Sequence, residues 1–214
     1  MKCTREMMRL YAVTDRAWLR GRRLEEQVEE ALRGGATLVQ LREKQLDEQA
    51  LLSEATGLAR LCHRYGVPLI VNDNVRVAMQ SGADGVHVGQ DDMEAAAVRR
   101  LLGPDMILGV TAKTVEQARR AQDAGADYLG SGAVFGSSTK LNAKPMTRET
   151  LSAITSAVSI PVVAIGGIHS GNILELAGTG IVGVAVVSGI FAAEHIEEEC
   201  RLLRRLAERT AACK

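Results

Sequence analysis

Short apolar, β-branched runs alternate along the chain with longer stretches of helical period. The apolar runs predict eight strands, at about 10–14, 37–41, 68–72, 84–88, 106–110, 127–130, 161–165 and 181–187. Between them, apolar residues recur three and four positions apart, as in Leu24, Val28 and Ala31. The pattern therefore predicts a βα unit repeated eight times.

The order of these units favours a closed parallel barrel. Three strands follow short turns of glycine and other small residues, at 34–36, 82–84 and 125–127, as expected where a helix end needs a left-handed residue. No run has the polar character of an edge strand, and no GxGxxG follows the first strand. We therefore predict an α/β fold, a (β/α)8 barrel forming a single domain over residues 1–214, with an open doubly wound sheet as the alternative.

Composition restricts the possible partners. Basic and acidic residues number 26 each, so no overall field would attract nucleic acid or an anionic membrane. Aromatic residues make up 3% of the chain, which argues against a base-stacking surface. The absence of a leader-like start and of any run near roughly 18 apolar residues predicts a cytoplasmic protein. Small molecules are the expected partners, and a homo-oligomer is compatible with the sequence.

The cysteines offer no metal-ligand spacing. They are scattered, at Cys3, Cys62, Cys200 and Cys213, without a CxxC pair or a nearby histidine at ligand spacing. We expect them to be reduced and structural.

Two aspartates follow neighbouring strands of the predicted barrel. Asp73 comes after the apolar run 69–71, and Asp92 comes after the run 86–88. If these strands are parallel neighbours, both carboxylates emerge at the same rim, where Mg2+ could take them as oxygen ligands. Each aspartate taken alone could instead form a turn or cap the next helix. The pair is our candidate metal site.

Cationic and amide side chains follow the second strand. Gln40, Arg42 and Lys44 share one face if the strand period of two continues through them. Buried there, they would need carboxylates, water or an anionic ligand as partners. The alternative is that Lys44 begins a solvated loop and Arg42 pairs with a neighbouring acid.

Hydroxyl groups follow the fifth and sixth strands. Thr111 could donate to a ligand, but the sequence favours a cap for the helix that starts near Thr114. The polar segment 130–145 cannot build a core and is either a lid or a slack connection. Within it, Ser137, Ser138, Thr139 and Lys140 could surround a phosphate, although the order GK[ST] of a Walker loop is missing.

Glycines follow the seventh and eighth strands, around Gly167 and Ser188. Glycine lets a ligand approach the backbone, and helix N-termini beyond these strands would offer N–H groups to an anion. We predict a phosphate site here, with tight turns alone as the alternative. His63 and His87 are expected to be structural, and His169, at the start of a predicted helix, receives no role.

Taken in order, these segments resemble the thiamine-phosphate synthase family. The matching segments are YAVTD (11–15), VQLREK (39–44), ND (72–73), GVHVGQDD (85–92), STK (138–140), AIGGI (164–168) and VS (187–188). The resemblance covers almost the whole chain. It implies a barrel enzyme that joins hydroxymethylpyrimidine diphosphate to hydroxyethylthiazole phosphate with Mg2+ and releases pyrophosphate.

The resemblance also implies roles for individual residues. Gln40, Arg42, Lys44 and Asn72 would contact the pyrimidine diphosphate, Asp73 and Asp92 would hold the metal, Ser137, Thr139 and Lys140 would grip the diphosphate, and Gly167, Val187 and Ser188 would bind the thiazole phosphate. Arg42, Lys44 and Lys140 would then be catalytic, because they stabilise negative charge on the leaving group.

Three positions depart from the family pattern. Thr111 replaces a serine that would contact substrate, Lys113 replaces a histidine, and residues 136–137 are Gly-Ser instead of Pro-Thr. A related thiazole tautomerase is one alternative, but its expected catalytic histidine aligns with Lys113. A non-catalytic phosphate-binding barrel is another, and the presence of both metal acids and Lys140 argues against it.

Overall fold

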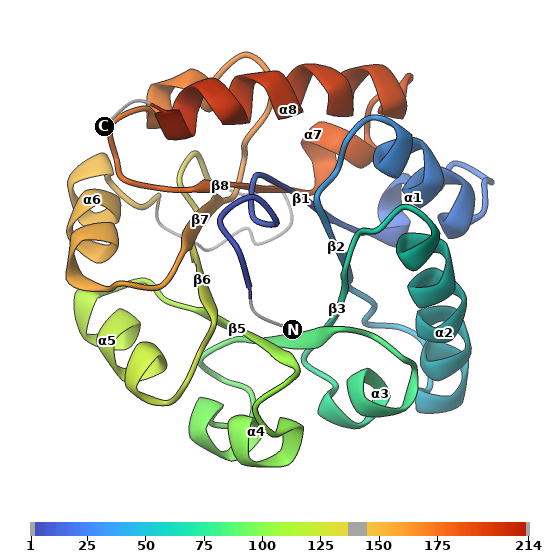
Figure 1. The fold of residues 1–214 in the computed structure, drawn as a ribbon. Helices are drawn as coiled ribbons and strands as arrows, with labels where there is room; N and C mark the ends of the chain where they lie inside the picture. The colour runs from blue at the N-terminus through green and yellow to red at the C-terminus, as the bar shows by residue number, and fades with distance from the viewer. Residues whose placement is uncertain (1–2, 137–144, 213–214) are drawn as a thin grey trace.

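The computed structural model describes residues 3–136 and 145–212, which fold around one closed barrel of parallel strands (Figure 1). The strands are β1 (Leu10–Val13), β2 (Leu38–Leu41), β3 (Leu69–Asn72), β4 (Gly85–Val88), β5 (Ile107–Thr111), β6 (Tyr128–Gly132), β7 (Val162–Ile165) and β8 (Gly183–Val186). Each strand pairs with the next, and β8 pairs with β1. The predicted (β/α)8 barrel is confirmed, and the doubly wound alternative is wrong because the sheet has no free edge.

Helices surround the barrel on the outside (Figure 1). They are η1 (Arg16–Trp18), α1 (Leu24–Arg33), α2 (Glu48–Arg64), α3 (Val75–Gln80), α4 (Ala95–Leu102), α5 (Val115–Asp123), α6 (Arg148–Ala157), η2 (Ile173–Leu176), α7 (Ser188–Phe191) and α8 (Ile196–Ala212). Polar residues begin several of them: Asp47 caps α2, Asn74 caps α3 and Thr114 caps α5.

The seventh βα unit differs from the prediction. Its connection contains only the short 3-10 helix η2, which α8 covers, and the Thr210 hydroxyl donates to the carbonyl of Ile173. His169 therefore does not begin a helix; it precedes η2 in a turn, where its N–H donates to Asn172 Oδ1 at 2.9 Å. Gly178 and Gly180 adopt positive φ directly after η2, which ends the helix early.

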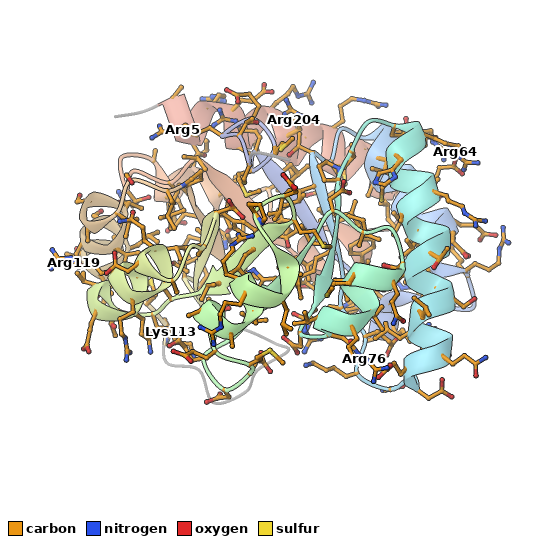
Figure 2. The ribbon with its side chains drawn as sticks, turned by 60° about the horizontal axis from the view of Figure 1, so that its bottom comes forward. Arg5, Arg64, Arg76, Lys113, Arg119 and Arg204 are labelled. Carbon is orange, nitrogen blue, oxygen red and sulfur yellow. The ribbon has the colours of Figure 1, made fainter. Side chains whose placement is uncertain are left out.

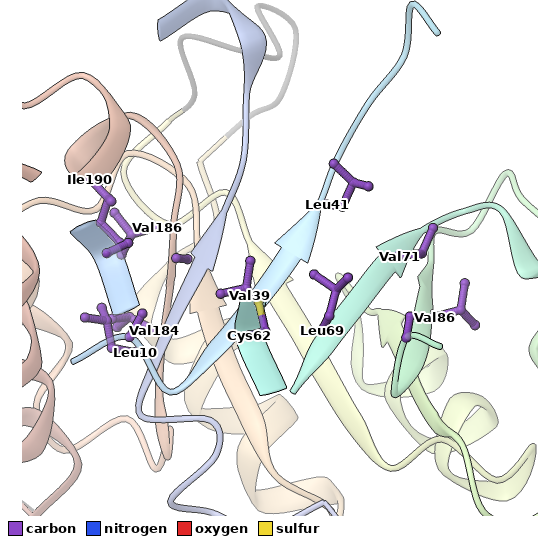
Figure 3. Close-up of a cluster of buried hydrophobic side chains, with 14 of the residues drawn as sticks. Leu10, Val39, Leu41, Cys62, Leu69, Val71, Val86, Val184, Val186 and Ile190 are labelled. Atoms are coloured by element: carbon purple, nitrogen blue, oxygen red, sulfur yellow. The ribbon is translucent and has the colours of Figure 1, made fainter. Parts of the chain in front are cut away.

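Successive strand residues pack into two separate cores. In β1, Leu10 and Ala12 belong to the cluster between strands and helices, whereas Tyr11 and Val13 fill the barrel interior. Figure 3 shows side chains of the outer cluster, with Leu10 and Val184 on strands and Cys62 and Ile190 on helices. The inner cluster consists of Met8, Tyr11, Val13, Leu38, Ile70, Ile107, Tyr128, Val163, Val182 and Ala185. Strands buried on both faces explain why the apolar runs are nearly continuous.

The loops that leave the strands gather at one end of the barrel. Figure 2 shows Arg76 and Lys113, which follow β3 and β5, at the lower end of the molecule, with Arg64 at the C-terminal end of α2 on the opposite side. Parallel pairing places all strand C-termini at this end, so residues far apart in sequence meet there.

Within the described residues, no helix combines the length and apolar character needed to cross a membrane. Cys3, Cys62 and Cys200 are free thiols, and Cys213 lies outside the described residues. Burial raises the pKa of Cys62 and of Cys200 to about 12, so both are protonated and unreactive at neutral pH.

Candidate active site

A cavity of about 170 Å3 lies at the C-terminal ends of the strands. Its lining includes residues that the sequence assigned to ligands, namely Gln40, Arg42, Asn72, Thr111, Gly167, Val187 and Ser188. These residues come from β2 and the segment just after it, from β3 and β5, and from the segments after β7 and β8. The fold therefore brings them together around one volume.

The polar side chains of β2 and of the segment after it divide between the cavity and its edge. Gln40 is buried and its Nε2 donates to the Tyr11 hydroxyl at 2.6 Å. Arg42 lines the cavity, and its Nη1 lies 3.9 Å from Asp15 Oδ2, so an acid partly balances its charge. Lys44 does not line this cavity; it lies three residues beyond the end of β2 at Leu41, and its side chain pairs with Asp73 instead. The prediction of one shared wall is correct for Gln40 and Arg42 and wrong for Lys44.

Lys44 contacts the candidate metal site instead. Its Nζ donates to Asp73 Oδ2, and the Asp92 carboxyl lies within hydrogen-bonding reach of Asp73. Parallel pairing of β3 with β4 brings the two acids to one rim, as predicted. The structure thus places one ammonium and two carboxylates in a single cluster.

Burial and the adjacent carboxylate raise the pKa of Asp73, while the bond from Lys44 opposes that shift. Asp73 also has a left-handed backbone, with φ of 62°, and its N–H donates to the carbonyl of His87 at 2.9 Å. Asp73 is not the helix cap, since Asn74 caps α3. Aspartate is one of the few non-glycine residues that adopt this conformation readily.

Asp92 has a structural contact as well. Its Oδ2 accepts from the N–H of Gly89 at 2.7 Å, which shapes the turn after β4. The turn-forming alternative is therefore correct for this oxygen. The approach to Asp73 is an additional contact of the same carboxyl group.

Thr111 and His87 meet inside the cavity. Thr111 does not cap α5, because Thr114 does so; its hydroxyl lies 2.9 Å from His87 Nε2. The Nδ1 atom of the same ring lies 3.0 Å from the Tyr128 hydroxyl. His87 was expected to be a satisfied structural residue, and it is satisfied, but it also lines the cavity. His63 is structural as predicted, with Nε2 2.9 Å from Asp84 Oδ2.

The far side of the cavity is built from backbone. Gly167 has φ of 66°, and a Cβ there would lie 2.9 Å from the carbonyl oxygen of Gly136. Ser188 begins α7, and Val187 precedes it. Within residues 3–136 and 145–212, the N–H groups of Gly167, Ser188 and Gly189 have no hydrogen-bond acceptor. Such unpaired donors at a cavity suit an anion.

Several residues around the cavity were not assigned a role from sequence. Asp15 faces Arg42, Tyr11 and His87 line the cavity, and the fully buried Tyr128 is hydrogen-bonded to both of them. Asn172 fastens the backbone after β7, because its Nδ2 donates to the carbonyl of Gly167 at 2.9 Å. The alternation of side chains along a strand was the sequence signal that could have placed both tyrosines inside the barrel.

Three predicted site residues cannot be placed. Ser137, Thr139 and Lys140 lie outside the described residues, so their role in gripping a diphosphate stays a prediction.

Comparison with known proteins now fixes the family. The profile of a family described as thiamine monophosphate synthase matches residues 10–190, which is most of the chain. The chain belongs to the thiamine monophosphate synthase family.

Individual members of the thiamine monophosphate synthase family align with this chain over nearly their full lengths. The chain is 50% identical to the thiamine-phosphate synthase of Ruminiclostridium cellulolyticum over 194 residues, covering 91% of this chain and 92% of the relative. It is 48% identical to that of Chloroflexus aurantiacus over 203 residues, covering 94% of both. The solved thiamine phosphate pyrophosphorylase from Pyrococcus furiosus superimposes with a TM-score of 0.89 at 36% identity, covering 96% of this chain and 98% of that one. The chain is accordingly a transferase of this family.

Proposed function

We propose that the chain joins hydroxymethylpyrimidine diphosphate to hydroxyethylthiazole phosphate, giving thiamine phosphate and pyrophosphate. The observation that supports this most is the shared cavity: Arg42 and Asn72 line one side, and Gly167 and Ser188 line the other. A substrate anion at each side leaves the two reacting rings between them. Membership of the family supports the same reaction.

The bond changes need no nucleophilic side chain. The C–O bond between the pyrimidine methylene and the diphosphate breaks, both electrons leave with pyrophosphate, and the thiazole nitrogen supplies the pair for the new C–N bond. Arg42 and Lys44 lie at the rim where they can stabilise charge on the departing diphosphate. Lys140 is proposed to assist from the segment after β6.

We propose Mg2+ as the cofactor, held by Asp73 and Asp92. The fit rests on the donors: two adjacent carboxylates repel each other, and burial and Asp92 raise the pKa of Asp73. A divalent cation relieves that repulsion, and Mg2+ favours one or two carboxylates together with substrate phosphate oxygens. When bound, the metal would neutralise charge on the diphosphate. Lys44 would then be released from Asp73 to contact the substrate.

The tautomerase alternative lacks its key residue. Lys113 lines the cavity where that enzyme is expected to have a catalytic histidine. The paired acids and the cations that follow β2, Arg42 and Lys44, also have no use in an isomerisation without a leaving diphosphate. The same cluster argues against a barrel that only binds phosphate.

The test is direct. Purified protein is incubated with both substrates and Mg2+, and thiamine phosphate and pyrophosphate are quantified together. We expect equal amounts of the two products, dependent on both substrates. Isomerisation of the thiazole precursor without pyrophosphate release would favour the tautomerase instead, and binding without turnover would favour the non-catalytic barrel.

A further inference from the structure

A continuous chain of hydrogen bonds joins four residues that line the cavity, Gln40, Tyr11, His87 and Thr111, through the buried Tyr128. It starts at Gln40 Nε2, which lies 2.6 Å from the Tyr11 hydroxyl, and the Tyr11 and Tyr128 hydroxyls lie 2.8 Å apart. From Tyr128 it continues to His87 Nδ1 at 3.0 Å, and from His87 Nε2 to the Thr111 hydroxyl at 2.9 Å. We call Tyr11, Tyr128 and His87 the relay.

The barrel leaves room for the relay. Gly109 of β5 is in register with His87 on one side and Tyr128 on the other. A Cβ at Gly109 would lie 2.2 Å from Tyr128 Cζ and 2.5 Å from His87 Nδ1, so only glycine lets these side chains meet across β5. The missing side chain also opens the place that the phenol fills, with the Tyr11 and Tyr128 rings packed edge to face at 5.8 Å.

The donors in the chain fix its direction. An amide nitrogen can only donate, so the Tyr11 oxygen accepts from Gln40, and the Tyr11 proton goes to Tyr128. Tyr128 then has His87 Nδ1 as the acceptor for its own proton, and a neutral ring that accepts at Nδ1 carries its proton on Nε2, which faces the Thr111 oxygen. Burial raises the pKa of both tyrosines, so each hydroxyl stays protonated and can act as a hydrogen-bond donor.

The end of the chain is a polarised hydroxyl. Because Thr111 accepts from His87, its own proton has to find an acceptor elsewhere, and Thr111 lines the cavity. Gln40 lines the same cavity and is held through its Nε2, which leaves its carbonyl oxygen as an acceptor for ligand. The two cavity groups are thereby set to opposite hydrogen-bonding roles.

We propose that the relay consists of positioning residues that present Thr111 as a donor and Gln40 as an acceptor to the pyrimidine substrate. This inference rests on the proposed function for the identity of the ligand. Its structural part, the tautomer of His87 with the proton on Nε2, does not depend on any ligand.

The first test is nitrogen-15 NMR of the histidine rings in the ligand-free, full-length protein, with His87 assigned by comparison with His87→Gln. We expect the His87 proton on Nε2 in the wild type, and loss of that fixed tautomer in Tyr128→Phe. A proton on Nδ1 in the wild type would overturn the relay direction whatever the activity of the protein.

The second test is calorimetric binding of the pyrimidine diphosphate and of the thiazole phosphate. We expect Tyr128→Phe to weaken binding of the pyrimidine diphosphate about three- to tenfold, the range for one hydrogen bond, and to leave the thiazole phosphate unchanged. Thr111→Val should do the same, whereas Thr111→Ser, which keeps the hydroxyl, should bind like the wild type.

Tyr65→Phe is the matched control, because Tyr65 is an exposed tyrosine bonded to Glu29 and distant from the cavity. It should leave both affinities unchanged. Equal weakening of both ligands in Tyr128→Phe would indicate general loss of structure and overturn the positioning role. A wild-type protein that binds no pyrimidine diphosphate while His87 carries its proton on Nε2 would contradict the proposed function and leave the relay standing.

Discussion

The carboxyl groups of Asp73 and Asp92 lie within hydrogen-bonding reach of each other at the ends of adjacent strands, and the second raises the pKa of the first. Burial adds to that effect, and Lys44 is the cation that offsets it. Two adjacent carboxylates repel each other at the rim. Binding of a cation to the carboxylates, or of an anionic substrate to Lys44, would change this charge balance. The arrangement of Asp73, Asp92 and Lys44 therefore supports the assignment of diphosphate chemistry to this site.

Lys44→Ala should separate substrate binding from metal binding. Loss of a charge-assisted contact should raise the KM for the pyrimidine diphosphate about 10- to 100-fold. The Mg2+ dependence should not weaken, because Lys44 competes with the cation for Asp73. Steady-state kinetics at varied concentrations of substrate and Mg2+ measure both the KM and the Mg2+ dependence. Arg76→Ala is the control, since Arg76 is an exposed cation that pairs with Glu48; a weaker Mg2+ dependence in Lys44→Ala alone would contradict the competition.

Ser188→Ala should raise the KM for the thiazole phosphate only about threefold, because backbone N–H groups remain at the site. Gly167→Ala should raise this KM more. Alanine is strained in the left-handed backbone conformation of Gly167, and its Cβ would approach the Gly136 carbonyl. Initial rates at varied thiazole phosphate measure the two effects. The same KM in Ser188→Ala as in the wild type would remove the side-chain role.

Cys62 gives a prediction about stability and pH. Its thiol has a pKa of about 12 when folded, against 9.0 as the ordinary value, so the unfolded chain ionises first as pH rises. The protonated Cys62 thiol therefore contributes its full stabilisation of the folded state below pH 9, and this contribution is lost as the pH rises from about 9 to 12. Urea unfolding should therefore show the stability difference between wild type and Cys62→Ala shrinking by about 1.4 kcal/mol from pH 8 to pH 10. A difference that does not change with pH would mean that the folded thiol ionises normally.

The fold followed from the sequence because strands buried on both faces leave continuous apolar runs, and these gave each strand to within two residues. Helices were less well determined. The connection after β7 has apolar residues and is long enough for a helix, but it is rich in glycine, and Gly178 and Gly180 adopt positive φ directly after η2, so only that short 3-10 helix forms. Packing of α8 over that gap is a tertiary effect that periodicity does not reveal.

Residues at strand ends were predictable, because parallel strands bring their C-termini to one rim. Asp73 and Asp92 meet for that reason. Lys44 was misplaced because the strand period was extended past Leu41, where β2 ends. The partners of His87 depend on which glycine of the neighbouring strand leaves space, and that requires the register, not the sequence alone.

The measurement that tests the central claim most directly is pyrophosphate release as a function of Mg2+ in Asp92→Ala, with Asp91→Ala as the neighbouring acidic control. Loss of one ligand from the paired site should cost about 3 kcal/mol or more, lowering the rate at least a hundredfold at Mg2+ levels that saturate the wild type. Asp91→Ala should keep wild-type rates and Mg2+ dependence. Full, Mg2+-dependent turnover in Asp92→Ala would contradict the assignment of the metal to this pair.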